Sequence, residues 1–435
     1  MMPKGSLVMS FLKKTTILVF VALNILLFHS GGVHASVPDE KSRIIGNIFS
    51  YGPVDRSVIL IEKKTDRLFL VKLGDPFPEV LAEYSVVTGQ NNGDKLREGD
   101  QKTPEGIYHI VKYIPPEKLD TRLFGNGAFP INYPNIVDRI HGKTGHGIWI
   151  HGRGELTNGR RTNGCISLTN DNLANLKGLL EPGFPVVITE EMDFLSPARY
   201  REERQTYLNY LMGLINAWKE NNFSLYKSFF SRSFRSSWNE DYTSYLERKK
   251  RLMLENPEKF ISLKEIVLYK ENSKELMYEY KQLYCTDNYI DFGLKKLYFE
   301  ANDNGEYMVI AEDYKPLPVE PEIKDSVVSF IKKWLDVWKK EDIKRYISFY
   351  SDRFSHGKMD LEGWSRYKKG VFERSNIKRI LIGDIRIKLL YGGRIQVRFI
   401  QDYESDILKD RGIKTLVLQG CPGNFRIVQE YWKPL

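Results

Sequence analysis

An internal repeat in the second half of the chain constrains its fold more than any other feature. Residues after about position 200 match those after about position 320 at an offset of about 119 residues. The matched positions are Ala217-Trp218-Lys219 with Val337-Trp338-Lys339, Tyr226 with Tyr346, Gln282 and Tyr284 with Gln401 and Tyr403, and Lys315-Pro316-Leu317 with Lys433-Pro434-Leu435. Each copy runs through helical and then strand-like hydrophobic patterns. The repeat therefore predicts two α+β domains of about 110 residues, at 200–317 and 322–435.

Length and composition place the chain among soluble multidomain proteins. Its 435 residues exceed one ordinary core, and 42% hydrophobic with 28% charged residues argue against wholesale disorder and a polytopic membrane protein. The net charge is +9, from 65 Lys and Arg against 56 Asp and Glu, but the basic residues are scattered. A dedicated nucleic-acid-binding function is therefore not expected.

The first 35 residues have the pattern of a secretory signal peptide. Lys13-Lys14 precede an apolar run from Ile17 to Phe28, and Val33-His34-Ala35 follows as a signal peptidase site. The apolar run is shorter than a membrane span, which favours cleavage after Ala35 over a retained anchor. We expect an exported protein of the periplasm or cell envelope, in which residues 36–55 form a linker.

Residues 56–190 predict a mainly β domain. Strands are expected at 57–61, 67–71, 82–88, 106–113, 147–150 and 185–188, separated by turns rich in polar residues, Gly and Pro. One helix is expected after a cap at Thr169 or Asn170, ended by Pro182-Gly183. Long amphipathic helical patterns begin after Ser196-Pro197, so the domain boundary falls near these residues.

A histidine and a cysteine lie in the most informative stretch of this domain. His151-Gly152 ends an apolar strand pattern, and Cys165 follows in Arg161-Thr162-Asn163-Gly164-Cys165. A cysteine nucleophile requires a thiolate, which an adjacent base generates when a carbonyl or carboxylate fixes its tautomer. Gly164 allows close approach of the backbone, and the amides of Gly164 and Cys165 are candidate oxyanion donors. We predict Cys165 as the nucleophile and His151 as the proton acceptor and donor.

These residues resemble the signature of the L,D-transpeptidase catalytic domain, the YkuD type. That signature is a His-Gly, a loop, and then Ser/Thr-His-Gly-Cys with an apolar residue, which His151-Gly152 and Thr162-Asn163-Gly164-Cys165-Ile166 match. Thr103-Pro104-Glu105-Gly106 resembles the Thr-Pro-x-Gly element of the family, and 185–188 resembles its closing strand. The chain departs from the pattern at Asn163, where the family has histidine. Asparagine donates a hydrogen bond to an oxyanion but cannot shuttle a proton.

The resemblance implies a reaction on the stem peptides of peptidoglycan. The cysteine attacks a peptide bond between an L-centre and a D-centre of a tetrapeptide donor and forms an acyl-enzyme. An amine of a second stem or of a lipoprotein resolves it by transpeptidation in cell wall biogenesis, whereas water gives L,D-carboxypeptidase activity. A non-catalytic wall-binding protein is a third alternative. No cofactor is implied.

Further candidates for substrate contact surround the two reacting residues. Gly152, Asn163 and Gly164 are candidates for substrate or oxyanion contacts. Among the loop arginines Arg153, Arg160 and Arg161, Arg161 is the preferred partner for a substrate carboxylate because it is closest to Cys165. Solvated side chains are the alternative for each arginine. His146 is a candidate for the pocket rim.

The repeats resemble the nuclear transport factor 2-like (SnoaL-like) superfamily, a cone of curved sheet wrapped by helices. The order of elements and the helical openings at Trp218-Lys219 and Trp338-Lys339 carry this resemblance. The fold class is thus a mainly β L,D-transpeptidase-like domain followed by two tandem α+β cones. Cell-shape carboxypeptidases of helical bacteria look like a YkuD-type domain joined to such a module, and the two copies here depart from that pattern. This fold serves both enzymes and binding modules, so wall components and divisome or elongation proteins are candidate partners of the cones.

The remaining cysteines, histidines and aromatic residues have less specific interpretations. Cys285 and Cys421 occupy non-equivalent repeat positions, and core roles are favoured over a disulfide between them. A metal site of His141, His146, His151 and Cys165 is disfavoured, because the five-residue spacing of the histidines separates the ligands. Trp218, Tyr226, Trp338 and Tyr346 are expected in the cores of the cones, with an open cone mouth that binds glycan or stem peptide as the alternative.

Overall fold

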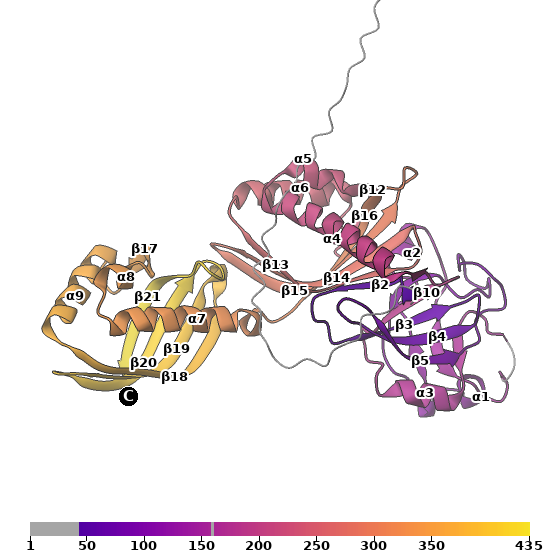
Figure 1. The fold of residues 1–435 in the computed structure, drawn as a ribbon, viewed down its shortest axis with the longest axis horizontal. Helices are drawn as coiled ribbons and strands as arrows, with labels where there is room; N and C mark the ends of the chain where they lie inside the picture. The colour runs from indigo at the N-terminus through magenta and orange to yellow at the C-terminus, as the bar shows by residue number, and fades with distance from the viewer. Residues whose placement is uncertain (1–42, 158–160) are drawn as a thin grey trace, which may run out of the picture. The chain divides into compact units, whose positions relative to one another are not determined.

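The structure is a computed structural model that describes residues 43–157 and 161–435 (Figure 1). The predicted signal peptide at 1–35 and the first part of the predicted linker lie outside these residues. Within the described ranges, no helix is both long and apolar enough to cross a membrane.

A five-stranded sheet forms the centre of the N-terminal domain, in the strand order β5-β4-β3-β10-β6. Its strands are β3 (Ser57–Glu62), β4 (Arg67–Lys72), β5 (Glu79–Ser85), β6 (Gly106–His109) and β10 (Pro185–Thr189). β3 and β10 run parallel, and the other pairs are antiparallel. β3 and β10 are buried along almost their whole length, which explains their continuous apolar, β-branched sequences. The prediction of a mainly β domain is confirmed.

A smaller, three-stranded sheet of the same domain carries the predicted catalytic residues. It consists of β7 (Ala128–Pro130), β8 (Trp149–Gly152) and β9 (Ile166–Leu168), with β8 in the middle. The helices around it are a 3₁₀ turn (Pro116–Lys118), α1 (Thr121–Phe124), α2 (Ile136–Ile140) and α3 (Asn170–Lys177). The Thr169 hydroxyl accepts the Asn172 N–H and caps α3, as one of the two predicted caps. The helix ends at Lys177, before the predicted stop at Pro182-Gly183.

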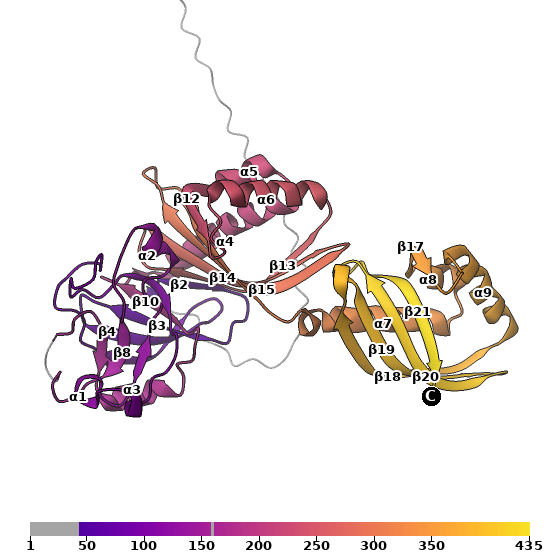
Figure 2. The same ribbon diagram turned by 180° about the vertical axis from the view of Figure 1, so that it is seen from behind.

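The first cone is a curved sheet with three helices against one face (Figure 1 and Figure 2). Its elements are α4 (Pro197–Lys219), α5 (Phe223–Ser228), β12 (Phe230–Ser236), α6 (Tyr242–Glu255), β13 (Phe260–Lys270), β14 (Glu275–Thr286), β15 (Tyr289–Ala301) and β16 (Tyr307–Pro316). Ser196 caps α4 and Pro197 is its first residue, which explains why the helical pattern starts at this point. The strands are ordered β12-β16-β15-β14-β13.

The second cone repeats this order of elements, which confirms the predicted duplication. Its elements are α7 (Val319–Lys339), α8 (Ile343–Ile347), β17 (Tyr350–Ser355), α9 (Leu361–Arg374), β18 (Ile377–Leu389), a 3₁₀ turn η2 (Tyr391–Gly393), β19 (Ile395–Ser405), β20 (Lys409–Gln419) and β21 (Arg426–Pro434). The sheet order β17-β21-β20-β19-β18 is equivalent to that of the first cone. Each cone thus has a core between its helices and its sheet, and the core of the second cone also includes Leu283, Cys285, Ile290 and Phe292 of the first.

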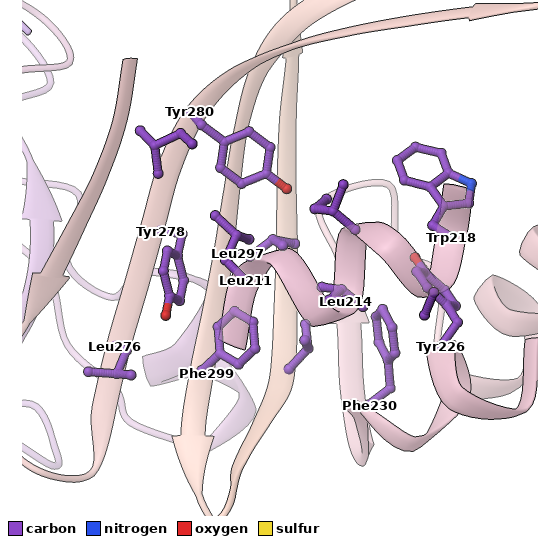
Figure 3. Packing of buried hydrophobic residues seen from close by; sticks show 14 of the residues in the cluster. Leu211, Leu214, Trp218, Tyr226, Phe230, Leu276, Tyr278, Tyr280, Leu297 and Phe299 are labelled. Carbon is purple, nitrogen blue, oxygen red and sulfur yellow. The ribbon is translucent and has the colours of Figure 1, made fainter. Parts of the chain in front are cut away.

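The core of each cone contains the aromatic residues that the repeat singled out. In the first cone, Trp218 and Tyr226 lie with Leu214 and Phe230 between α4, α5 and the sheet (Figure 3). Trp338 and Tyr346 are buried in the second cone at the equivalent positions. The prediction of core roles is confirmed for these four aromatic residues.

The prediction that residues 36–55 form a linker is wrong for the part that the structure describes. β1 (Ile44–Ile45) pairs with β11 (Phe194–Leu195), and β2 (Ile48–Tyr51) pairs with β13 as a sixth strand of the first cone. Ile44, Ile45, Ile48 and Phe49 of this short segment are all buried in the sheets that they join, whereas a linker exposes its side chains. The segment therefore ties the N-terminal domain to the first cone.

The expectation of separate core roles for Cys285 and Cys421 is also wrong. The two cysteines form a disulfide that joins the end of β14 to the loop after β20, with Cα atoms 5.7 Å apart. The two cysteines occupy non-equivalent positions in the repeat, since Cys285 lies on β14 of the first cone and Cys421 follows β20 of the second. Cys165 is the free cysteine of the described chain, as the odd number of cysteines required.

Candidate active site

The parallel pairing of β8 with β9 brings His151 and Cys165 to the same region of the sheet. His151 lies opposite Ser167, and Ile150 opposite Ile166. Because paired residues of parallel strands project to the same face, the Ser167 side chain lies on the face that carries the His151 ring. Cys165 comes directly before β9, two residues before Ser167, so the strand pairing brings the chain at Cys165 near His151.

The His151 ring is held in one orientation by its own backbone. Its Nδ1 lies 2.6 Å from the Gly152 carbonyl oxygen, so Nδ1 donates the proton and Nε2 keeps its lone pair. The Phe124 ring meets the imidazole edge-on, with centroids 5.2 Å apart. Burial lowers the pKa of His151 below its ordinary value. The predicted fixation of the ring by a backbone carbonyl is confirmed, and the ring is a neutral base.

Cys165 is half-buried, and its thiol is not ionised in advance. Burial raises the pKa of the Cys165 thiol to about 11, although the Trp149 backbone N–H and the Lys95 charge oppose this shift. The Sγ lies 3.4 Å from the Gly147 carbonyl oxygen, to which a neutral thiol donates. The expectation of a thiolate near neutral pH is therefore corrected, because desolvation outweighs the nearby donors. A thiol with this pKa requires a base that takes its proton during nucleophilic attack.

The loop before Cys165 is held in an unusual conformation that requires glycine. Gly164 has a φ of +121°, and a Cβ at this position would lie 2.6 Å from the Lys102 carbonyl oxygen. The Thr162 hydroxyl accepts the Gly164 N–H at 3.1 Å and donates to the Cys165 carbonyl at 2.6 Å. The Gly164 amide is therefore occupied, which removes one of the two predicted oxyanion donors.

Two further residues that contact this loop were not predicted to have a role. The buried Thr103 donates through its hydroxyl to the Gly164 carbonyl at 3.0 Å. Gln90 donates through its side-chain amide to Asn163 Oδ1 at 3.1 Å. Thr103 lies in the Thr-Pro-x-Gly element, which is a usable sequence signal, whereas nothing in the sequence marks Gln90.

The other predicted site residues are dispersed. Arg161 pairs with Asp66 at 2.7 Å and with the Thr88 hydroxyl at 3.1 Å, so its guanidinium is already engaged. The His146 side chain is 82% exposed and lies 3.6 Å from Glu98. Gly152 packs against Asn170, whose Nδ2 donates to the Arg153 carbonyl at 3.0 Å. Arg160 lies outside the described residues.

The histidines also do not assemble into a metal site. His141 lies 3.1 Å from the Glu300 carboxylate of the first cone, whereas His151 bonds to the Gly152 carbonyl. No group of three or more metal-ligating side chains occurs in the part of the chain that the structure describes.

Each cone contains a cavity lined by charged, polar and aromatic side chains, of about 660 Å³ in the first and about 750 Å³ in the second. Six lining residues of the first cavity have an equivalent in the second: Trp218 and Trp338, Lys249 and Lys368, Gln282 and Gln401, Tyr284 and Tyr403, Lys295 and Lys414, and Glu312 and Glu430. Lys295 pairs with Glu312 at 2.8 Å, and Lys414 pairs with Glu430 at 2.6 Å. The second lysine of each cavity lies over an indole ring, at 4.2 Å for Lys249 and 4.7 Å for Lys368.

Some polar groups in the cavities have no partner within residues 43–157 and 161–435. Lys249 and Lys368 form no ion pair there, and the buried Oε1 atoms of Gln282 and Gln401 accept no hydrogen bond. Burial lowers the pKa of Lys249 to about 7 and that of Lys368 to about 8. Each cavity is thus lined by a lysine without an ion pair and by a glutamine whose buried Oε1 accepts no hydrogen bond.

Family models match both parts of this architecture. Residues 56–188 match the L,D-transpeptidase catalytic domain of the YkuD type, and residues 207–313 and 326–431 each match the Cds6 C-terminal NTF2-like domain. The chain therefore joins an L,D-transpeptidase catalytic domain to two NTF2-like domains. The fold class expected from the sequence is confirmed.

The transpeptidase domain also has a curated relative. A protein of Escherichia coli strain K12 that is named as an L,D-transpeptidase, YafK, is 33% identical over 116 residues. This match covers 26% of the chain and 42% of the relative, so the chain spans less than half of that protein.

Two solved structures match a larger part of the chain than this relative does. Bd1075 of Bdellovibrio bacteriovorus is 26% identical with a TM-score of 0.57, covering 64% of this chain and 99% of that one. The helical cell shape determining protein Pgp2 of Campylobacter jejuni is 27% identical with a TM-score of 0.51, covering 62% of this chain and 95% of that one. About a third of the chain therefore extends beyond each of these relatives.

Proposed function

We propose that the protein is an exported cysteine enzyme that acts on peptidoglycan stem peptides as an L,D-transpeptidase in cell wall biogenesis and cell shape. The observation that supports this proposal is the pairing of β8 with β9, because β8 carries the tautomer-fixed His151 and Cys165 comes directly before β9. The transpeptidase family match supports the substrate class. Export to the periplasm or cell envelope rests on the signal-like pattern of residues 1–35.

The reaction starts from a neutral thiol and a neutral imidazole. As Cys165 Sγ attacks the carbonyl carbon at the L-centre, Nε2 of His151 takes the thiol proton. His151 then protonates the departing amine of the D-residue, and a thioester remains on Cys165. An acceptor amine attacks this thioester, loses its proton to His151, and forms the new amide bond while the thiol is restored.

L,D-carboxypeptidase activity is the second candidate, in which water replaces the acceptor amine. The structural match to Pgp2, a protein named for helical cell shape, supports a role in cell shape, and the sequence resembles cell-shape carboxypeptidases of helical bacteria. The same Cys165 and His151 serve both reactions, so the outcome depends on which acceptor reaches the thioester.

The cones are proposed to hold the enzyme on the wall by binding stem peptides. A stem peptide ends in a carboxylate next to an amide N–H, which complements an unpaired ammonium such as Lys249 and an unpaired acceptor such as Gln282. Trp218 provides an apolar wall for the aliphatic part of the peptide. The second cone repeats the same set.

Mass spectrometry of muropeptides incubated with the protein lacking residues 1–35 tests the enzymatic proposal. Dimers joined through two diaminopimelates, absent with Cys165→Ala, are expected for a transpeptidase. Shortened stems without dimers, again absent with Cys165→Ala, identify a carboxypeptidase. An unchanged muropeptide profile with both proteins contradicts both activities and leaves the wall-binding alternative.

A further inference from the structure

We propose that Thr103 and Gln90 are positioning residues that assemble the oxyanion site of this enzyme from the Cys165 backbone N–H and the Asn163 side-chain amide. The inference rests on the proposed acyl-transfer function and names the groups that stabilise its tetrahedral intermediate. Neither Thr103 nor Gln90 touches the reacting atoms, and both act through the loop at 162–165.

Thr103 fixes the peptide unit between Gly164 and Cys165. Its hydroxyl donates to the Gly164 carbonyl at 3.0 Å and accepts the Gly89 N–H at 2.9 Å, and its side chain is fully buried. A hydroxyl that satisfies both a donor and an acceptor in a buried place has one orientation. The Gly164 carbonyl is therefore held on the Thr103 side of the loop.

This arrangement determines where the Cys165 N–H points. In a planar trans peptide the carbonyl and the following N–H point in opposite directions, and the Gly164–Cys165 bond is not among the cis bonds of the chain. The Cys165 N–H is thus directed away from Thr103. Among the described residues it meets no hydrogen-bond acceptor, in contrast to the Gly164 N–H, which Thr162 occupies. A free backbone N–H on the nucleophile itself is a suitable oxyanion donor.

Gln90 determines which end of the Asn163 amide faces the substrate. Its Nε2 donates to Asn163 Oδ1 at 3.1 Å, so Oδ1 is used and the Nδ2 group remains available as a donor. The backbone keeps Gln90 in place, because its N–H donates to the Thr162 carbonyl at 3.0 Å. Asn163 without this contact would present its acceptor as readily as its donor to the developing negative charge.

Two probes of Cys165 separate the oxyanion site from the thiol. Acylation by a carbapenem passes through an oxyanion, whereas alkylation by iodoacetamide is a displacement at carbon that forms none. A Thr103→Val variant keeps the shape of the side chain but loses the hydroxyl. We expect it to slow carbapenem acylation by about 10-fold to 100-fold, while alkylation stays within about 2-fold of the wild type.

Control variants distinguish this role from a general loss of packing. Thr103→Ser keeps the hydroxyl and is expected to retain most of the acylation rate. Thr189→Val removes a buried hydroxyl that bonds to the Glu191 carbonyl at 3.1 Å, outside the site, and is expected to leave both rates unchanged. Equal slowing of alkylation and acylation in Thr103→Val, or unchanged acylation, overturns the proposed role of Thr103.

Gln90 provides a second test at an exposed position, where folding is not at risk. Gln90→Leu is expected to slow acylation about 5-fold without a change in alkylation. In an Asn163→His background, which removes the amide that Gln90 orients, Gln90→Leu is expected to have no further effect. Gln205→Leu is the matched control, because Gln205 makes the same kind of contact with Asn209 at 2.8 Å on α4. Equal effects of Gln90→Leu in both backgrounds overturn the role of Gln90.

The wild-type reaction separates failure of this inference from failure of the proposed function. A wild-type protein that forms no carbapenem adduct overturns the acyl-transfer function, and the oxyanion site with it. A wild type that acylates normally, together with variants that acylate equally fast, overturns only the roles of Thr103 and Gln90.

Discussion

The charge states of Cys165 and His151 control how the proposed reaction begins. Burial raises the pKa of the thiol and lowers that of the imidazole, so both are neutral around pH 7. A neutral imidazole with a free Nε2 accepts the thiol proton only as sulfur attacks. The proposed reaction is therefore selective for the substrate, because any other electrophile meets a neutral thiol and not a reactive thiolate.

The pH dependence of acylation tests this charge assignment. His151 acts as a base when it is neutral, and its lowered pKa keeps it neutral at more acidic pH than an ordinary histidine. We expect the acid limb of the carbapenem acylation rate to lie below pH 6.5, the ordinary histidine pKa. This limb is measured by quenching the acylation reaction at a series of times between pH 4 and 9 and determining the fraction of adduct by intact-protein mass spectrometry. An acid midpoint above 6.5 would contradict a desolvated neutral base.

At the residue scale, the sequence predicts Cys165 and His151 as the reacting pair, and this stays a prediction, whereas their supporting contacts were not predictable. A cysteine and a histidine that both neighbour glycines mark nucleophilic chemistry locally. The contacts of Gln90 with Asn163 and of Thr103 with Gly164 join loops that are 73 and 61 residues apart. The Thr-Pro-x-Gly element marks Thr103 but not its partner, and nothing in the sequence marks Gln90. Arg161 was predicted to bind substrate, but its ion pair with Asp66 depends on the same kind of distant contact.

At the scale of elements, the loop before β9 depends on the segment that follows β5. The Thr162 N–H donates to the Thr88 carbonyl, and Val87 and Ser167 exchange backbone hydrogen bonds with N···O distances of 2.9 Å. These bonds hold the loop as if it were an additional strand. The strand predicted at 82–88 includes Val87 and Thr88, but the pairing of this segment with the loop before β9 was not predictable, because that loop has no strand-like period.

Gly164→Ala is expected to disturb this element at its tightest point. The φ of +121° strains any residue with a Cβ, and that Cβ would meet the Lys102 carbonyl. We expect a loss of about 1–3 kcal/mol in the free energy of unfolding and a strong fall in acylation. Gly178→Ala is the control, since Gly178 has a helical conformation and open space around its Cα. Denaturant unfolding and carbapenem adduct formation measure both effects; equal behaviour of the two variants would contradict the strained geometry.

At the scale of the whole molecule, the catalytic domain and the first cone share a hydrophobic core. Val58 and Leu60 of β3 pack in one cluster with Val267 and Tyr269 of β13. Glu279 of the first cone, also buried, pairs with Arg56 at 2.5 Å and His109 at 3.3 Å. Duplication and domain order were predictable because a repeat is visible along the sequence. The shared core was not predictable, because the apolar patterns of its strands are the same as those of strands in two separate cores.

The disulfide joins the second cone to the first at the edge of a cavity. Thr286, next to Cys285, lines the cavity of the first cone, and Gln419 near Cys421 donates to the Asp287 carbonyl at 3.0 Å. The two cones are thereby held by a covalent bond in addition to the chain. Under the proposal that the cones bind stem peptides, a peptide bound in one cavity raises the effective concentration of a second stem peptide at the other.

Lys249→Met and Lys368→Met test whether both cavities bind the wall. Each variant removes one cationic donor, so we expect each to weaken binding to purified sacculi and the double variant to abolish most of it. Their neighbours Lys250 and Lys369 are exposed on α6 and α9, and Lys250→Met with Lys369→Met is the matched control. Because the pKa of Lys249 is about 7 and that of Lys368 about 8, both lose their charge as the pH rises, and wild-type binding is expected to weaken between pH 6 and 9. Co-sedimentation with sacculi measures each effect, and binding by the double variant equal to that of the control would contradict a wall-binding role of the cavities.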